Sequence, residues 1–190
     1  MKFAPHQAPG FDAALAALRR SGIVAYPTEG VFGLGCDPGD DDALARLITL
    51  KGRPAAAGLI LIAAEFSQLA PWLAPLDPAL EARAAATWPG PVTWVWPASV
   101  VVDRRLTGGR ATLAVRVTAH PVASALCHAF GGALVSTSAN YHGEPPARTA
   151  AEVKATFGAT VDAVIDAPCG GLSGPTEIRD ALTGQVLRAG

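Results

Sequence analysis

Two cations, Lys51 and Arg53, interrupt an apolar stretch of the sequence, LITLKGRPAAAGLILIAA at residues 47–64. A residue before proline is held in extended backbone, so Arg53 should point away from the axis of a helix that ends near Gly52. Lysine supplies a point charge and arginine a planar fork of N–H donors, and together they suit an anion such as phosphate. Lys51 has a second interpretation, because a cation at a helix C-terminus also complements the helix dipole. The pair is a candidate anion clamp, with this simpler role left open for Lys51.

A second set of polar side chains lies on two apolar runs, ATLAVRV and LVSTSAN. Side chains alternate between the two faces of a strand, so Thr112 shares a face with Arg116, and Ser136 shares one with Ser138 and Asn140. Ligands of open α/β sheets bind beyond the carboxyl ends of strands, which is where such polar groups are useful. Ser, Thr and Asn at strand ends are also common turn formers, and that alternative stays open for the second run. We expect Thr112 and Arg116 to line the same cavity as Ser136 and Ser138.

The elements that must position these residues alternate between helical and strand patterns. Apolar periodicity and capping residues predict helices over residues 11–20, 40–50, 77–88, 121–130 and 150–157. Apolar runs predict strands over residues 23–27, 59–64, 91–97, 111–117, 132–140 and 161–168, with a terminal hairpin around Thr183 and Gly184. The glycine-rich residues 28–40 are predicted to form a loop. This order favours one α/β domain with a mixed sheet over residues 1–190.

Composition excludes several classes of protein. Half of the 190 residues are hydrophobic and 16% are charged, below the roughly 25% of average soluble proteins, so much of the chain must be buried. The net charge of −1 argues against wrapping nucleic acid by bulk electrostatics, although a local basic cleft is compatible with it. The three cysteines form no C-x-x-C pair, and no apolar run reaches the roughly 18 residues of a membrane span. We expect a cytoplasmic protein without a membrane segment.

Familiar catalytic motifs are missing from the sequence. It contains no phosphate-binding P-loop, no H-E-x-x-H, no G-x-S-x-G elbow and no S-x-x-K. The glycines after the first predicted strand follow the order G-x-x-G-x-G, which is not the dinucleotide fingerprint, and the four histidines lack metal-ligand spacing. Three arginines, Arg104, Arg105 and Arg110, are interpreted as a solvated loop, with added positive potential at the anion site as the alternative. The residues alone indicate a polar, cationic cleft without a covalent nucleophile, which suits chemistry on a bound polyphosphate.

Six ordered segments together resemble the YrdC-like family: YPTEGVFGLGCDP, KGRP, WPGPVTWVWP, LAVRVTAHP, STSAN and PTEIRDALTGQVLRAG. The resemblance runs through nearly the whole chain, and it implies a twisted mixed sheet flanked by helices around a positively charged cavity. It further implies an adenylate-forming nucleotidyltransferase that converts L-threonine, bicarbonate or CO₂, and ATP, with magnesium, to threonylcarbamoyl-AMP and pyrophosphate. The product would pass to a tRNA threonylcarbamoyl transferase machinery that modifies position 37 of tRNAs. Direct contact with tRNA or double-stranded RNA stays open.

The resemblance also implies roles for single residues. Those implied to contact ATP and carry the catalysis are Lys51, Arg53, Ser138 and Asn140. Two further nucleotide contacts are Thr112 and Arg188, and the residues near threonine are Arg116, Ser136 and Thr176. The loop after the first strand contributes Thr28 and Glu29 to the cavity. The sequence departs from the family pattern at Ala57, where relatives commonly carry a polar or cationic residue near the nucleotide, and at Gly30, where threonine is common. It also departs at Ile62, where some members carry histidine, and at Tyr141 and His142, which replace Leu-Ser.

Two other functions fit part of the sequence. One is a non-catalytic module that binds double-stranded RNA or tRNA, against which the near-neutral net charge counts. The other is a hydrolase or carbamoyl transferase that uses Ser138 with Lys51, against which the missing serine motifs count.

Overall fold

The structure is a computed structural model that describes residues 4–52 and 54–190, so the predicted role of Arg53 lies outside the described residues. Its strands join into one sheet in the order β7-β1-β2-β6-β3-β5-β4-β8-β9. Their bounds are β1 Val24–Pro27, β2 Phe32–Gly35, β3 Ile60–Ala63, β4 Val92–Pro97, β5 Thr112–Val117, β6 Leu134–Ser138, β7 Ala163–Val164, β8 Glu177–Asp180 and β9 Val186–Arg188. Three neighbouring pairs, β1/β7, β3/β5 and β4/β8, are parallel and the other five are antiparallel. The prediction of a mixed sheet is confirmed.

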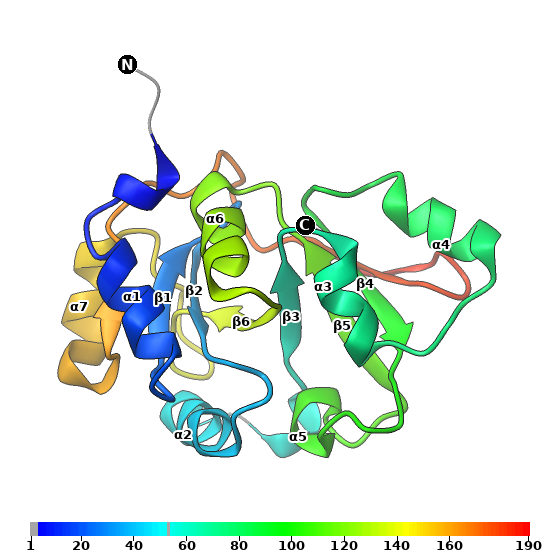
Figure 1. Cartoon of the computed structure of the whole chain (residues 1–190), viewed down its shortest axis with the longest axis horizontal. Coiled ribbons are helices and arrows are strands. Elements are labelled where there is room, and N and C mark those ends of the chain that lie inside the picture. The colour runs from blue at the N-terminus through cyan, green and yellow to red at the C-terminus, as the bar shows by residue number, and fades with distance from the viewer. Residues whose placement is uncertain (1–3, 53) are drawn as a thin grey trace.

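Short helices connect these strands and cover the sheet (Figure 1). The α-helices are α1 Phe11–Leu18, α2 Asp41–Lys51, α3 Phe66–Leu69, α4 Pro78–Ala85, α5 Arg104–Thr107, α6 Pro121–Phe130 and α7 Ala150–Phe157. The residues that the structure describes also form four 3₁₀ turns: η1 Pro5–Gln7, η2 Ala55–Ala57, η3 Ala70–Trp72 and η4 Gly158–Thr160. Within the described part of the chain, no helix has the length and apolar character needed to cross a bilayer.

The helix ends follow the capping chemistry of the sequence. The Asp40 carboxylate accepts a hydrogen bond from the Ala43 amide at 2.9 Å, and Thr149 and Glu152 form the complete capping box that begins α7. Helix α2 ends where Gly52 takes a left-handed conformation, with φ of 55°. Asp40 and Thr149 therefore set the starts of α2 and α7, and Gly52 sets the exit of the chain beyond Lys51, as predicted.

Two apolar clusters lie on opposite faces of the sheet. One contains α1 and α6, which pack side by side and cover Val24, Tyr26, Ile62 and Leu134 (Figure 1). The other contains side chains from α2, α4, α5 and α7 together with the alternate residues of the same strands. Strand β3 therefore contributes to both clusters, as expected for an apolar run without polar alternation.

The predicted loop over residues 28–40 is wrong, because β2 forms within it. Strand β2 pairs antiparallel with β1 and with β6, so it lies inside the sheet rather than at its surface. Its glycines permit close packing: a Cβ on Gly35 would lie 2.2 Å from the Val135 carbonyl oxygen and 2.8 Å from the Tyr26 hydroxyl. The strand predicted over residues 161–168 is also much shorter than expected, since only β7 pairs there.

Candidate active site

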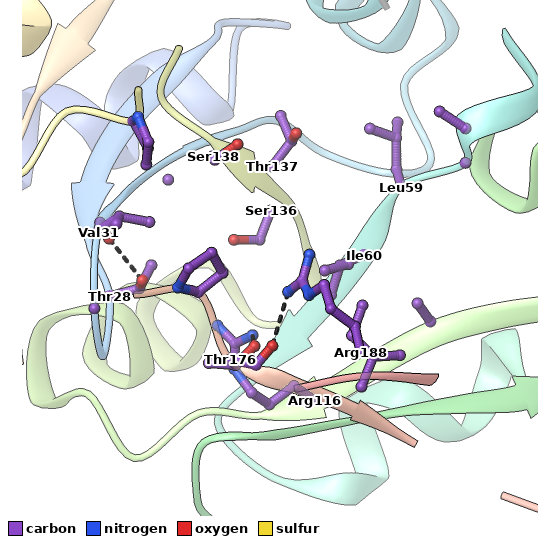
Figure 2. Close-up of a pocket in the computed structure, with 18 of the residues that line it drawn as sticks. Thr28, Val31, Leu59, Ile60, Arg116, Ser136, Thr137, Ser138, Thr176 and Arg188 are labelled. Atoms are coloured by element: carbon purple, nitrogen blue, oxygen red, sulfur yellow. Dashed lines mark hydrogen bonds between the residues drawn. The ribbon is translucent and has the colours of Figure 1, made fainter. Parts of the chain in front are cut away.

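A cavity of about 370 Å³ opens on the face of the sheet that also carries α1 and α6. Its floor is a row of residues that lie directly opposite one another on four neighbouring strands: Ser136, Ile60, Ala114 and Val95. Ser136 and Ala114 have small side chains, which leave space above the sheet between the larger side chains of Ile60 and Val95 and their neighbours. Figure 2 shows that labelled side chains surround the space from several segments, with Thr28 and Val31 on one side and Leu59 and Ile60 on the other.

The prediction from strand alternation is confirmed. Thr112, Arg116, Ser136 and Ser138 all line this cavity. The alternate residues of β5 point to the opposite face and belong to the larger apolar cluster: Leu113, Val115 and Val117. The cavity therefore collects one face of β5 and the polar end of β6.

A buried ion pair lies at one end of the cavity. The Arg116 Nη2 donates to the Glu29 Oε2 at 3.1 Å, and the two side chains are only 5% and 9% exposed. The second Glu29 oxygen accepts hydrogen bonds from the Thr118 hydroxyl at 2.7 Å and from the Ala119 amide at 3.1 Å. The Arg116 Nη1 donates to the hydroxyls of Thr93 and Thr176 at 3.2 and 3.0 Å. Thr93 and Thr176 therefore accept from the guanidinium while Thr118 and Ala119 donate to its partner Glu29, and these contacts fix the direction of the guanidinium.

Glu29 itself does not line the cavity, although Thr28 and Gly30 on either side of it do. Glu29 is buried, and its carboxylate faces the Arg116 network. The family resemblance placed Glu29 in the cavity loop, and in the structure its carboxylate contacts Arg116, which lines the cavity.

Lys51 extends from the end of α2 to the end of β6. Its Nζ donates to the carbonyl oxygens of Ser138 and Asn140 at 2.6 and 2.5 Å, and to the Asn140 Oδ1 at 2.8 Å. The Ser138 hydroxyl donates to the same Oδ1 at 2.6 Å, and the Asn140 Nδ2 donates to the Glu144 carbonyl at 2.6 Å. Lys51 is 3% exposed and does not line the cavity, whereas Ser138 and Asn140 line it. Lys51 thus holds two cavity residues in position.

The remaining residues implied by the resemblance also meet at the cavity. Thr28, Thr176 and Arg188 line it, and Arg188 donates to the Thr176 carbonyl at 2.7 Å. Partial burial, and then the positive charge of Arg116, lower the pKa of Arg188. The dashed contacts in Figure 2 include this bond and the bond from the Thr28 hydroxyl to the Val31 carbonyl, which closes the loop between β1 and β2.

Several site residues escaped the sequence reasoning. Thr93 and Thr118 complete the network of Arg116, and Thr118 lies two residues beyond Arg116, so alternation could have placed it on the same face. Thr137 also lines the cavity, together with Ser136 and Ser138 on either side of it in β6. Arg110 also lines the cavity, which agrees with the alternative of added positive potential rather than with a solvated loop alone.

A short loop closes the cavity beside Gly30. The amides of Gly170 and Leu172 donate to the carbonyls of Thr28 and Glu29 at 2.9 and 3.1 Å, and Pro175 and Thr176 then reach the cavity. A Cβ on Gly30 would lie 2.0 Å from the Gly174 carbonyl oxygen, so glycine at this position permits the close approach of the two loops.

Buried His120 lies behind this network and gives a pH-dependent prediction. Its Nε2 donates to the Pro168 carbonyl at 3.1 Å, while its Nδ1 is buried without a hydrogen-bond partner. Burial lowers the pKa of His120, and the Pro168 carbonyl and Glu29 oppose that shift. The pKa of His120 is therefore lower in the folded protein than the ordinary value of about 6.5 in the unfolded chain. Above that pH neutral His120 does not oppose folding, and as pH falls below it the unfolded chain takes up the proton first and the folded state loses stability.

We expect the free energy of unfolding to fall as pH drops from about 7.5 to about 5.5, and to fall less in His120→Gln. Glutamine keeps a donor for Pro168 and cannot take up the proton. Urea unfolding at several pH values measures the difference. Parallel pH profiles for the two proteins would contradict the role given to His120.

Comparisons with known proteins agree with this arrangement. The family model for Sua5, YciO and YrdC proteins, described as "Telomere recombination", matches residues 16–190. The threonylcarbamoyl-AMP synthase of Halorhodospira halophila is 61% identical over 175 residues, which are 92% of each chain. That of Coxiella burnetii is 49% identical over 92% of this chain and 94% of its own.

A solved structure, P. abyssi Sua5 complexed with L-threonine, matches 92% of this chain with a TM-score of 0.86 and 35% identity. The chain spans about half of that protein, 52% of its length.

Proposed function

The chain belongs to the family of Sua5, YciO and YrdC proteins, and from that premise we propose that its cavity converts L-threonine, bicarbonate or CO₂, and ATP to threonylcarbamoyl-AMP and pyrophosphate. The reaction makes the chain an adenylate-forming nucleotidyltransferase with ATP as a substrate. One observation carries the assignment to this cavity. Residues that the family resemblance connects with ATP and residues that it connects with threonine line one space, although they come from separate segments.

The chemistry needs no protein nucleophile. The threonine nitrogen forms a bond to the carbon of CO₂ and loses a proton, or takes the carbon from bicarbonate with loss of water, which gives N-carboxythreonine. A carboxylate oxygen of that carbamate then bonds to the α-phosphorus of ATP, the bond from this phosphorus to the bridging oxygen breaks, and pyrophosphate leaves. The protein contributes positioning and donors for the negative charge.

The threonine end of the cavity is the buried network around Arg116. A guanidinium held by Glu29 and two threonine hydroxyls keeps a fixed direction, as binding of an amino acid carboxylate requires. Ser136 and Thr176 lie beside it as hydroxyl donors or acceptors. We place threonine against these three residues.

The ATP end is the end of β6 with its surroundings. Ser138 and Asn140 line the cavity in positions set by Lys51, and Thr112 adds a hydroxyl group. Arg188, which donates to the Thr176 carbonyl, would reach the nucleotide from the threonine end. Lys51 contributes positive charge behind them, and Arg53 keeps its proposed role as a phosphate contact. Thr28 shapes the wall opposite Leu59. We propose that this distribution gives the cavity positive charge at the phosphates of ATP.

Magnesium fits the cavity as a companion of ATP. Over residues 4–52 and 54–190, no group of three His, Cys, Asp or Glu side chains is placed to hold a metal ion. Mg²⁺ commonly keeps its waters and binds through substrate phosphates, so we propose that it enters with ATP and partly neutralises the triphosphate. The residues that would lie beside the ion are Ser138 and Asn140, which line the cavity, and the ion would supply positive charge to the triphosphate.

The cellular setting is also part of the proposal. We propose that residues 1–190 act as one YrdC-like domain in the cytoplasm, which the free thiols of Cys36, Cys127 and Cys169 support. The labile product passes to a tRNA threonylcarbamoyl transferase machinery for modification of position 37. The relatives do not favour the alternative of a non-catalytic RNA-binding module.

Product formation by the purified protein tests the function. We expect pyrophosphate release and a threonylcarbamoyl adenylate mass only when ATP, bicarbonate and L-threonine are all present. Three reactions that each omit one substrate are the controls. Tight binding of labelled tRNA without any adenylate would overturn the proposed function in favour of an RNA-binding module.

A further inference from the structure

Arg110 is an exposed arginine at the cavity whose guanidinium is fixed by backbone contacts. Its Nη1 donates to the Ala56 carbonyl at 2.6 Å and its Nη2 donates to the Ala57 carbonyl at 3.3 Å. Both Arg110 and Ala57 line the cavity. A guanidinium has five N–H donors, so the two contacts orient it and leave other donors for a ligand.

The segments on both sides of this contact are built to meet. The Leu59 amide donates to the Leu106 carbonyl at 2.8 Å, which joins the end of η2 to α5. A Cβ on Gly58 would lie 2.5 Å from the Arg110 Nη2, and a Cβ on Gly108 would lie 2.6 Å from the Ala56 carbonyl oxygen. Both glycines also have a positive φ of 63°. The position of Arg110 therefore depends on two glycines that permit a close approach.

Two other cations near the cavity already bind groups of the protein. Arg116 is paired with Glu29, and Lys51 donates to the end of β6. Among the described residues that line the cavity, the remaining arginines are Arg110 and Arg188, and no carboxylate is among the lining residues. Arg110 lies on the side of Ala57 and Leu106, away from the Arg116 network that we assign to threonine.

We infer that Arg110 binds the β- and γ-phosphates of ATP and supplies, from the loop before β5, the cation that position 57 lacks. The inference rests on the proposed function, since it names a phosphate contact of the same site. The methyl group of Ala57 cannot bind an anion, and the Ala57 carbonyl instead accepts a hydrogen bond from the Arg110 guanidinium. A planar guanidinium in a fixed direction suits the oxygens of two adjacent phosphates.

Equilibrium binding of ATP and of AMP to Arg110→Ala tests the inference. The charged contact is lost to the outer phosphates only, so we expect ATP affinity to fall about tenfold or more while AMP affinity changes less than about threefold. Arg110→Gln keeps a donor for the Ala56 carbonyl without the charge, and it should lose ATP affinity as Arg110→Ala does. Arg104→Ala is the matched control, because it removes an exposed arginine of α5 that does not line the cavity. We expect it to bind both nucleotides as the unmodified protein does.

The outcomes separate a phosphate contact from a structural brace. Equal losses of ATP and AMP affinity in Arg110→Ala, or unchanged ATP affinity in Arg110→Gln, would overturn the inference. Thermal unfolding of each variant identifies a general loss of fold. The binding assay contains neither threonine nor bicarbonate, so a failure to form product would overturn the proposed function and leave this result standing.

Discussion

Lys51→Met is expected to lower kcat by about 100-fold or more and the free energy of unfolding by about 2 to 4 kcal/mol. The ammonium donates to two backbone carbonyls and to the Asn140 side chain, and methionine leaves these acceptors without that donor in a buried site. The Ser138 hydroxyl donates to the same Asn140 oxygen, so the loss releases both residues that we place at ATP. Steady-state kinetics and urea unfolding measure the two effects.

Lys154→Met is the matched control for this substitution. Lys154 is an exposed residue of α7, and its replacement should leave both turnover and stability within ordinary surface variation, about 0.5 kcal/mol. Activity is compared at a temperature at which circular dichroism shows every variant folded. Wild-type turnover in folded Lys51→Met would show that the ammonium does not organise the ATP end of the cavity.

Glu29→Gln is expected to lower the free energy of unfolding by about 3 kcal/mol and to raise the KM for threonine by about tenfold. The substitution leaves Arg116 buried without its counter-charge. The glutamine NH₂ group cannot accept a hydrogen bond, so either Arg116 or the donors of Thr118 and Ala119 lose their acceptor. The guanidinium then loses its fixed direction. The KM for ATP should change less, because Ser138 and Asn140 are held by Lys51.

A double-mutant cycle with Arg116→Met isolates the pair. We expect a coupling energy of about 1 to 3 kcal/mol in unfolding, since the two groups are in direct contact and both are buried. Glu65→Gln, at an exposed residue before α3, is the control for removing a carboxylate charge. Additive effects of Glu29→Gln and Arg116→Met would contradict the idea that Glu29 positions Arg116.

Local patterns predicted most of the elements. Caps at Asp40 and Thr149 and the period of two in β5 are properties of a few neighbouring residues, so the sequence contains their full cause. Strand β2 was missed because its glycines are typical of loops. Their use here depends on the packing of Tyr26 and Val135, and Val135 lies on a strand that follows much later in the chain.

The site was predictable as a set of residues and less so as a set of contacts. Alternation grouped Thr112 with Arg116, and Ser136 with Ser138 and Asn140. The family resemblance named Thr28, Glu29, Thr176 and Arg188. The partner of Arg116 is 87 residues away in sequence, and the Ser138 carbonyl is 87 residues from Lys51. Contacts of this kind depend on strand order, which no local pattern contains. Arg110 shows the same limit, because an exposed loop arginine becomes a cavity residue only through the docking of α5 on η2.

The most direct test of the central claim, that one cavity holds both substrates, is a crystal structure of the protein with L-threonine and α,β-methylene ATP. We predict the threonine carboxylate at Arg116 and the α-phosphate beside Ser138 and Asn140. The amino group of threonine, which is the nucleophile toward CO₂, should face the α-phosphate across the floor formed by Ser136 and Ala114. Threonine or the nucleotide bound outside this cavity would contradict the account.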